Sequence, residues 1–559
     1  MSRGKKLFLM TLMTFIALIA VSQFSHSADP GGTSTGNISD YSGAIANETV
    51  PKVVNGTKVT TVPLTAQGIN QLANETGHLR ISINFVWLLI TGFLVLFMQV
   101  GFAFLVTGLT RAKNAGHMMM MNLSSFAIAL LAYYAVGFAF QFGGLATPQL
   151  GGTSPLNGIF GRGTAGLIGT HGFFLQSGNS YDVGVLALFL FQVVFMETAG
   201  YIIIGAIAER ISFAGFILAE IAMGAIIYPI YGNWMWGGGW LSQLGSPSSL
   251  GLGHGAVDFA GSGVVHATGG WAALALAQIL GPRIGKYRKD GSIRAFPGHN
   301  LGYVVIGTLV LVFGWMGFNP GSTFAGADLR IAVVAVNTLL AGCAGTVTAM
   351  AWTNWRYGKP DISMSCNGML AGLVAITAPC AFVGPWAATI IGVIAGFIVC
   401  YSVEWFDRKL RIDDPCGAIS VHGMCGLWGV LAVGLFADGT YGFGWNGVAG
   451  PVKGLFYGDG GQLLAQVIDA VVGFAWAWGV TYLLFIVIRR FVQIRVSPEV
   501  EIEGTDRGEF GQVAYPDYVL VTESDPGSAE EVEAYLSKLM KGGGNGAAAP
   551  APEPTVPSG

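Results

Sequence analysis

The stretch Asp258-Phe-Ala-Gly-Ser-Gly-Val-Val-His266-Ala-Thr-Gly-Gly270 predicts how the whole chain is organised. A second stretch, Asp414-Pro-Cys-Gly-Ala-Ile-Ser-Val-His422-Gly-Met-Cys-Gly426, has the same spacing of Asp, Val, His and Gly. Each lies in a long apolar segment with no other ionisable side chain near the His. An imidazole at membrane depth costs free energy unless it has a partner or lines a polar cavity. Two imidazoles in repeated settings therefore suggest a pair that acts together on something polar crossing the bilayer.

Composition places the chain among all-α integral membrane proteins. Hydrophobic residues make up 52% and charged residues only 11% of the sequence, whereas a soluble domain carries roughly 25% charged residues. The 84 glycines in 559 residues suit close packing of helices in lipid. The net charge of -3 leaves no basic surface that would indicate a nucleic-acid partner.

The first 80 residues precede the membrane domain. Residues 1–28 have the pattern of a secretory signal peptide, with Arg3, Lys5 and Lys6 before an apolar run and small residues at 25–28. Residues 29–80 are rich in Ser, Thr, Gly and Asn, which predicts an exposed, poorly ordered segment on the outer side.

A membrane domain is predicted over residues 81–490. It contains eleven apolar segments long enough to span a bilayer as helices of about 20 residues. Their approximate limits are 82–110, 117–141, 182–208, 212–232, 258–280, 300–318, 331–353, 364–383, 386–406, 416–437 and 463–488. Residues 491–559 form a predicted cytosolic tail, with an amphipathic helix over 528–541 and a Gly/Ala/Pro-rich, disordered end.

The charges in the loops predict the orientation. Loops after odd-numbered segments carry Arg111 and Lys113; Arg210; Arg283, Lys286, Arg288, Lys289 and Arg294; Arg356 and Lys359; and Arg408, Lys409 and Arg411. The other loops carry only Arg162, Arg330 and Lys453. By the positive-inside rule, the N-terminus lies outside and the C-terminus inside. The expected location is the plasma membrane, or the inner membrane of a Gram-negative cell.

Counting segments also predicts an internal symmetry. His266 lies in the fifth segment and His422 in the tenth, so the repeat has five spans and reverses direction. The halves are therefore expected to be inverted five-helix repeats, followed by one additional helix. The two histidines should then meet near the midplane of the membrane.

Aromatic residues and one hydroxyl are predicted to gather at the outer side. Phe191 and Phe195 begin the third segment, Trp236 lies in the loop after the fourth, and Ser322 follows the sixth. Aromatic faces attract a small cation and a hydroxyl accepts its hydrogen bond. The alternative is an aromatic belt at the membrane interface.

At this point the sequence resembles the ammonium transporter family, whose relatives include the Rh proteins. The matching motifs, which span residues 82–515, are Phe191-Gln192-x-x-Phe195, Gly205-Ala-x-Ala-Glu209-Arg210, Trp236-Gly-Gly-Gly, Asp258-Phe-Ala-Gly-x-x-Val-His266, His299-Asn-Leu, Gly317-Phe-Asn-x-Gly-Ser322, Asp413-Asp-Pro and Val421-His422-Gly-x-Cys-Gly. One departure is Gly417, which stands where many members carry a further Asp.

The resemblance implies a homotrimeric ammonium transporter with eleven helices. It implies that Phe195, Trp236 and Ser322 form an outer ammonium site and that Phe195 and Phe318 form a gate beneath it. His266 and His422 would line a hydrophobic lane for ammonia, with methylammonium as a substrate analogue. Asp258, Phe191 and Gln192 would support the site structurally. A cytosolic regulator of the PII type is an expected partner, because the basic loop from Arg283 to Arg294 lies on the inner side.

Elementary chemistry agrees with this expectation. A bare ammonium ion cannot cheaply enter an apolar lane, whereas neutral ammonia can, and two imidazoles can exchange hydrogen bonds with it and relay a proton. No metal, cofactor or enzymatic activity is expected, because no nucleophile–base pair or ligand cluster is visible. Glu197 lies about 200° around a helix from Phe195, so it should point away from the lane, and a hydrogen bond at a trimer contact is expected for it. The alternatives are an ammonium sensor with the same fold and an Rh-type channel for ammonia or carbon dioxide.

Overall fold

The computed structural model describes residues 52–54, 57–59, 66–142, 159–160, 166–176 and 183–516. The chain divides into two units, Met1–Gln512 and Val513–Gly559, and the helical bundle belongs to the first. The predicted signal peptide (1–28) and the predicted tail helix (528–541) lie outside the described residues.

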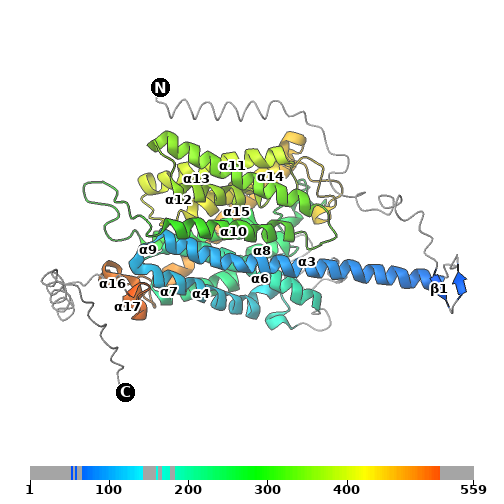
Figure 1. Cartoon of the computed structure of the whole chain (residues 1–559), viewed down its shortest axis with the longest axis horizontal. Coiled ribbons are helices and arrows are strands. Elements are labelled where there is room, and N and C mark those ends of the chain that lie inside the picture. The colour runs from blue at the N-terminus through cyan, green and yellow to red at the C-terminus, as the bar shows by residue number, and fades with distance from the viewer. Residues whose placement is uncertain are drawn as a thin grey trace, which may run out of the picture. The chain divides into compact units, whose positions relative to one another are not determined.

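The bundle is built almost entirely from helices (Figure 1). The α-helices are α3 (Ala66–Leu109), α4 (Ala115–Ala132), α5 (Phe138–Gln141), α6 (Val183–Ile207), α7 (Phe213–Ala222), α8 (Tyr228–Trp236), α9 (Thr268–Leu280), α10 (Leu301–Gly321), α11 (Ile331–Tyr357), α12 (Ile362–Ile376), α13 (Pro385–Trp405), α14 (Cys425–Phe436), α15 (Gly460–Ile488), α16 (Pro498–Glu503) and α17 (Thr505–Phe510). The π-helical segments are η3 (Tyr133–Gly137), η7 (Met223–Ile227), η9 (Ser262–Ala267), η10 (Phe406–Leu410) and η11 (Ile419–Met424). Short 3₁₀ turns are η2 (Ala112–Asn114), η5 (Phe173–Leu175), η8 (Ser242–Gly245), η12 (Trp445–Gly447) and η13 (Leu455–Tyr457).

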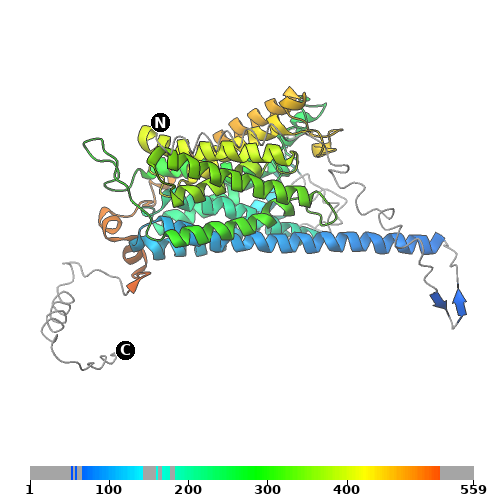
Figure 2. The ribbon, with the colours of Figure 1, turned by 45° about the horizontal axis from the view of Figure 1, so that its top comes forward.

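The few strands form two small antiparallel pairs. Strand β1 (Lys52–Val54) pairs with β2 (Thr57–Val59), and β3 (Ile159–Phe160) pairs with β4 (Ile168–Gly169). The first pair and the start of α3 at Ala66 fall inside residues 29–80. The prediction of a poorly ordered segment is therefore wrong for these stretches. Figure 2 shows α3 continuing beyond the ends of its neighbours.

Ten helices of the described chain are long and apolar enough to cross a membrane. They match ten of the eleven predicted segments. The remaining segment, the eighth, is predicted over 364–383, and a shorter apolar helix of 15 residues, Ile362–Ile376, occupies most of it. The helix ends early because the backbone turns after Ile376: the carbonyls of Thr377 and Ala378 accept hydrogen bonds from Ala260 and Phe259. A count of eleven spans thus depends on how this short helix is placed in the bilayer.

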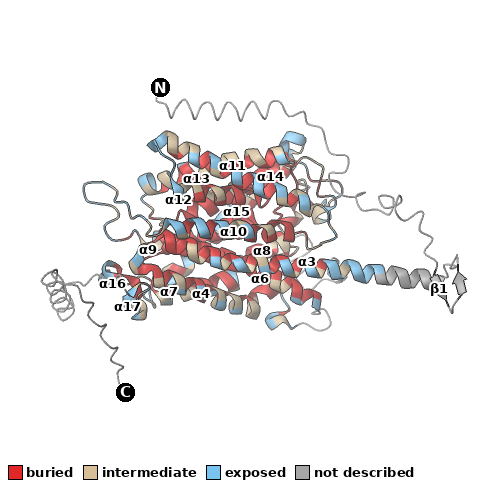
Figure 3. Ribbon diagram, viewed as in Figure 1, coloured by how far each residue is buried: buried red, intermediate tan, exposed pale blue. Residues whose placement is uncertain are grey.

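Burial divides the bundle into a core and a rim (Figure 3). The spans Val183–Ile207 and Ser262–Leu280 are 89% buried, whereas Gly460–Ile488 is 22% buried. Helices α3 and α10 pack closely through small residues: a Cβ at Gly307 would lie 2.5 Å from the backbone nitrogen of Leu105. Close approach of this kind is how helices associate in lipid. Of the ten spans, the two that contain α6 and η9–α9 are the most buried.

Candidate functional site

Asp258 caps the segment that carries His266. Its two carboxylate oxygens accept hydrogen bonds from the backbone N–H groups of four residues at 2.8–3.0 Å, namely Gly261, Ser262, Gly263 and Val264. These are the free donors of a helix start, so the geometry is that of an N-cap. The four bonds tie the direction of η9, and with it the position of His266, to one carboxylate.

Asp414 has the same role before His422. It accepts hydrogen bonds from the backbone N–H groups of Gly417, Ala418 and Ile419 at 2.8–3.1 Å. Gly417, where the family pattern has Asp, has φ of 76°, a left-handed conformation that favours glycine. The repeat in the sequence is therefore also a repeat of local backbone structure.

The two histidines meet in the buried centre of the bundle. His266 lies on η9 and His422 on η11, both π-helical, and their Nδ1 atoms are 3.2 Å apart. His266 is fully buried and His422 is 5% exposed. Among the described residues, none forms a hydrogen bond with the Nε2 atom of His266. A single open position on an otherwise paired imidazole can donate to, or accept from, a small polar molecule.

Aromatic rings stack on one side of this pair. The ring of His266 lies parallel to those of Trp315 and Phe318, with centroids 5.1 and 5.4 Å away. Phe318 in turn stacks on Phe195, with centroids 4.0 Å apart and an angle of 25°. Trp315 is held by a hydrogen bond from its Nε1 to the hydroxyl of Thr377. The phenyl rings of Phe318 and Phe195 therefore separate His266 from the residues on the far side of Phe195.

Beyond the phenyl rings lies Trp236. It is in the last turn of α8, so the prediction that it lies in a loop is wrong: the helix continues past residue 232 to Trp236. Its ring is edge-on to Phe195, at 6.3 Å, and its Nε1 donates to the carbonyl of Asp258. Asp258 thus positions both His266 and Trp236. We call the end of the bundle with Trp236 the outer end.

The remaining residues predicted for the outer site vary in how they connect to it. Ser322 caps α10 and its hydroxyl donates to the carbonyl of Phe318 at 2.9 Å. Phe191 packs against Phe195, with centroids 4.6 Å apart. Gln192 is buried, and its Oε1 has no hydrogen-bond partner among the described residues. The structure therefore brings Phe191, Phe195, Trp236 and Phe318 into one aromatic cluster, and Ser322 is attached to it by its hydrogen bond to the backbone of Phe318.

A small cavity lies on the other side of the histidine pair. Its volume is about 20 Å³. This is enough for one water or ammonia molecule. His422 lines it together with Phe102, Tyr201, Ile202, Gly205 and others. The path from Trp236 through the phenyl rings and histidines to this cavity is called the lane below.

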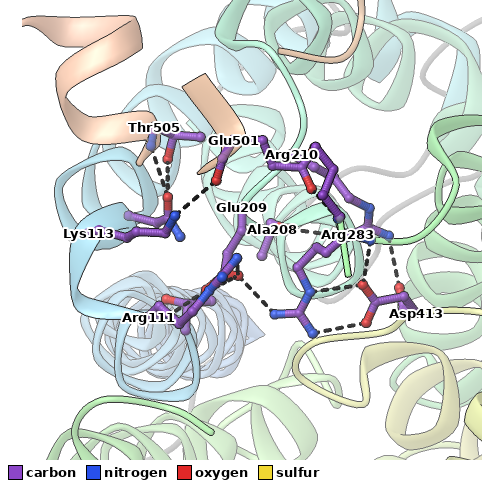
Figure 4. Close-up of polar contacts among 12 residues, drawn as sticks. Arg111, Lys113, Ala208, Glu209, Arg210, Arg283, Asp413, Glu501 and Thr505 are labelled. Carbon is purple, nitrogen blue, oxygen red and sulfur yellow. Dashed lines mark hydrogen bonds and ion pairs between the residues drawn. The ribbon is translucent and has the colours of Figure 1, made fainter. Parts of the chain in front are cut away.

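An ion network closes the opposite, inner end of the bundle (Figure 4). Glu209 accepts from the side chains of Arg111 and Arg283, and Arg283 forms a two-pronged pair with Asp413 at 2.8 and 2.9 Å. Burial acts to raise the pKa of Glu209, but the two arginines outweigh it and lower that pKa to about 2. Burial also acts to raise the pKa of Asp413, but the hydrogen bonds and charge of Arg283 outweigh it and hold that pKa well below its usual range.

Sequence reasoning quoted Glu209 and Asp413 only as parts of motifs and assigned them no role. The available signal was a set of opposite charges at the adjoining ends of four apolar segments. Glu209 also has φ of 68°, unusual for a residue other than glycine. Such a backbone persists when its surroundings hold it, and here two ion pairs do so.

The segment after α15 docks on the same inner end. Asp506 of α17 accepts from the backbone N–H groups of Gly116 and His117 at the start of α4, at 2.9 and 2.7 Å. Glu509 accepts from the N–H of Phe213 at the start of α7, and Glu501 from that of Ile284. Carboxylates from the tail thus satisfy helix starts in the bundle.

Among the described residues, no group of three or more His, Cys, Asp or Glu could hold a metal ion. Glu197 is 1% exposed and accepts a hydrogen bond from Gln99 of the same chain. This partner, Gln99, lies on α3.

Fold and site together define a class: a helical membrane protein with several spans, in which a histidine pair lies beneath stacked aromatic rings. The ammonium transporter family model matches residues 86–515. The chain is 51% identical over 441 residues to ammonium transporter Amt2 of Archaeoglobus fulgidus, covering 79% of this chain and 90% of that one. It is 36% identical over 454 residues to a putative ammonium transporter of Synechocystis, covering 80% and 92%.

Solved structures give the same result. A protein titled "Sensor Amt Protein" is 35% identical with a TM-score of 0.67, covering 78% of this chain and 99% of that one. Mep2 of Candida albicans is 28% identical with a TM-score of 0.65, covering 78% and 92%. The chain belongs to the ammonium transporter family, a family of membrane transporters and not of enzymes.

Proposed function

We propose that this protein transports ammonium by binding the cation at Trp236, removing a proton from it, and passing ammonia through the lane. The single observation that carries this mechanism is the paired imidazoles of His266 and His422, 3.2 Å apart beneath two stacked phenyl rings. The aromatic faces and the Ser322 hydroxyl at the outer end suit a small cation. Behind Phe195 and Phe318, the described residues that line the lane are aromatic rings, imidazoles and other uncharged side chains, which offer no carboxylate to replace the cation's water shell.

Selectivity follows from the free energy of desolvation. Burying an unpaired cation is far more costly than burying a neutral polar molecule that keeps hydrogen bonds. Ammonium can lose a proton and enter as ammonia, whereas potassium cannot. The open Nε2 position of His266 would then exchange a hydrogen bond with ammonia as it passes.

The setting of this mechanism is also part of the proposal. We infer eleven spans in two inverted five-helix repeats plus one helix, with the N-terminus outside and the C-terminus inside the plasma membrane. Support comes from the loop charges and from the matching caps formed by Asp258 and Asp414. A homotrimer with one lane per subunit is inferred because all lane residues come from one chain. In mixed trimers, transport should then fall in proportion to the number of inactive subunits.

The inner end is proposed as the docking place of a cytosolic regulator of the PII type. The loop from Arg283 to Arg294 is basic and lies beside the docked segment Pro498–Phe510. Pull-down from cytosol of cells grown at low and high nitrogen tests this. Absence of binding in both states would count against it.

The mechanism is tested by electrical recording on liposomes containing the purified protein. An ammonium jump should produce a current, and a potassium jump of equal size should not. Methylammonium should compete as an analogue. A potassium current comparable to the ammonium current would contradict entry as ammonia.

A sensor function is the second candidate, because one similar structure is titled a sensor. The curated relatives with the higher identities are named transporters instead. An ammonium-driven current in the purified protein separates the two candidates, since a sensor need not move charge.

A further inference from the structure

Two buried carboxyl groups lie on neighbouring helices inside the bundle, outside the lane. Glu197 of α6 is 1% exposed and Glu220 of α7 is fully buried. Each has one hydrogen bond: Gln99 Nε2 donates to Glu197 at 3.3 Å, and Ser125 Oγ donates to Glu220 at 2.8 Å. The second oxygen, Oε1, of each carboxyl has no partner. A buried carboxyl with a free oxygen is unusual enough to require an explanation.

The backbone of α6 makes room for this pair. A Cβ at Gly200 would lie 2.4 Å from Oε2 of Glu220 and 3.3 Å from the hydroxyl of Ser125. The Glu220 carboxyl therefore rests directly on α6 at Gly200. Glu197 precedes Gly200 by three residues and thus lies on the same face of that helix. The four helices α3, α4, α6 and α7 each contribute one side chain to this carboxyl cluster.

No positive charge balances the cluster. Among the described residues, neither glutamate forms an ion pair. The side chains that α3 and α4 contribute, Gln99 and Ser125, are neutral. The nearby imidazole, His266 on η9, belongs to the lane and forms its hydrogen bond with His422. Two neighbouring carboxylates without a counter-ion cannot both be ionised in a low-dielectric interior. At least one proton must therefore be bound there.

Tyr201 joins the cluster to the lane. It follows Glu197 by four residues, so it lies on the same face of α6, and its hydroxyl is buried without a partner. It also directly follows Gly200, on which the Glu220 carboxyl rests. The same side chain lines the cavity that His422 lines from the opposite side. One side chain is thus in contact with the inner part of the lane and lies beside the carboxyl cluster.

We propose that Glu197 and Glu220 form a proton-binding site, reached from the lane cavity past Tyr201, that accepts the proton released by ammonium. In this step an N–H bond of ammonium breaks and its electron pair stays on nitrogen as ammonia leaves. The proton crosses the histidine pair, where one ring nitrogen accepts it as another releases a proton toward the cavity, and an O–H bond forms on a carboxylate oxygen. This inference rests on the proposed function for the source of the proton. It gives that proton a binding place beyond the histidine pair.

Infrared spectroscopy of the full-length protein tests the bound proton without any transport. At neutral pH the difference spectrum between the wild type and the double variant Glu197→Gln/Glu220→Gln should contain the C=O band of a protonated carboxyl group, over and above any band from another buried carboxyl, Asp469, which both proteins keep. Each single variant should shift or weaken the band. Glu404→Gln, which removes a carboxyl from the inner rim, is the control and should leave it unchanged. A difference spectrum without the band overturns the proposal, even if ammonium transport is normal.

Ammonium-driven current tests whether the site takes part in transport. The double variant and Tyr201→Phe should each reduce the current on the order of tenfold, less than the loss of a sole acid–base group, because water can still carry protons. Glutamine keeps the shape of glutamate and one oxygen that can accept from Gln99 or Ser125, so trimers should still assemble. Wild-type current in all these variants overturns the transport role, and if His266→Ala still abolishes the current, the proposed lane mechanism stands without it. Loss of current accompanied by loss of assembly in the double variant also counts against the proposal, unless both single variants assemble and lose current.

Discussion

The Nδ1 atoms of His266 and His422 lie 3.2 Å apart, so the one proton between them gives the two neutral rings opposite tautomers. The ring that donates through Nδ1 keeps its Nε2 as an acceptor, and the other ring carries its proton on Nε2. Along the lane, one imidazole can therefore accept a hydrogen bond and the other can donate one. A passing ammonia molecule, which does both, fits such a pair.

Replacing either histidine with alanine should abolish proton-coupled ammonium current. The remaining imidazole loses its partner, which costs about 1–3 kcal/mol for a buried polar group. Helix packing is otherwise unchanged, so His266→Ala and His422→Ala should still reach the membrane and assemble. His78→Ala, at an exposed position on α3, is the matched control and should behave as wild type. Normal ammonium current in both lane variants, with potassium still excluded, would place selectivity at Trp236, Phe195 and Ser322 instead.

An acidic replacement at the inner histidine should change what the lane admits. A carboxylate in His422→Glu would stabilise positive charge where the wild type offers a neutral ring. Intact ammonium could then pass, and potassium with it. Potassium-driven current in liposomes measures this directly, with His422→Gln as a neutral control of similar size. Continued exclusion of potassium by a well-assembled His422→Glu protein would show that the phenyl rings, not the histidines, reject the ion.

The two capping aspartates should differ in how much they stabilise the protein. Asp258→Ala leaves four backbone N–H groups without an acceptor. Asp414→Ala leaves two, because the N–H of Gly417 also bonds the backbone carbonyl of residue 414. Each unsatisfied buried donor costs about 1–3 kcal/mol before relaxation. Both variants should therefore melt at lower temperature in detergent, Asp258→Ala more so. Asp258→Ala should also weaken ammonium binding, because the lost cap no longer fixes the backbone carbonyl of residue 258 that accepts from Trp236. Asp290→Ala, in an exposed turn, is the control. Equal melting temperatures for all three would contradict the capping role.

Much of this structure can be predicted from the sequence because it depends on local patterns. Apolar runs predict the spans, and the repeated Asp-to-His spacing predicts that His266 and His422 meet. The ends of helices are less predictable, because distant contacts decide them. The eighth segment stops at Ile376 where Ala260 and Phe259 bind its next carbonyls, and α8 continues to Trp236, where Asp258 binds the indole.

Interactions across helices were the part that sequence reasoning missed. Glu197 and Glu220 are each an isolated carboxyl in an apolar segment, but nothing in the sequence indicates that the two lie close together. Only the packing of α7 on Gly200 reveals that they share one cluster. In the same way, Glu209 and Asp413 are 204 positions apart, and the sequence contains nothing that pairs both with Arg283.

Acid should destabilise the inner end of the bundle through Glu209. Its pKa is about 2 in the folded protein, against roughly 4.3 for a free glutamate. Because the folded value is the lower one, the ionised carboxylate stabilises the fold. That contribution is fully present above about pH 4.3 and is lost as the pH falls through the folded pKa. Asp413, whose pKa is also lowered, adds to the loss in the same direction.

Glu209→Gln should therefore lower stability at neutral pH and weaken the acid transition. Removing one partner of a buried ion network leaves Arg283 incompletely paired, and such losses are about 3–5 kcal/mol. Glu404→Gln is the control, because Glu404 pairs with Arg356 at 3.6 Å on a half-exposed surface, where a pair contributes about 0–1 kcal/mol. The measurement is the melting temperature of the detergent-purified protein from pH 7 down to pH 3. If Glu209→Gln melts like the wild type at pH 7 and shows the same decline in acid, the network does not stabilise the inner end, and the left-handed backbone of Glu209 must be held by the packing of its neighbours alone.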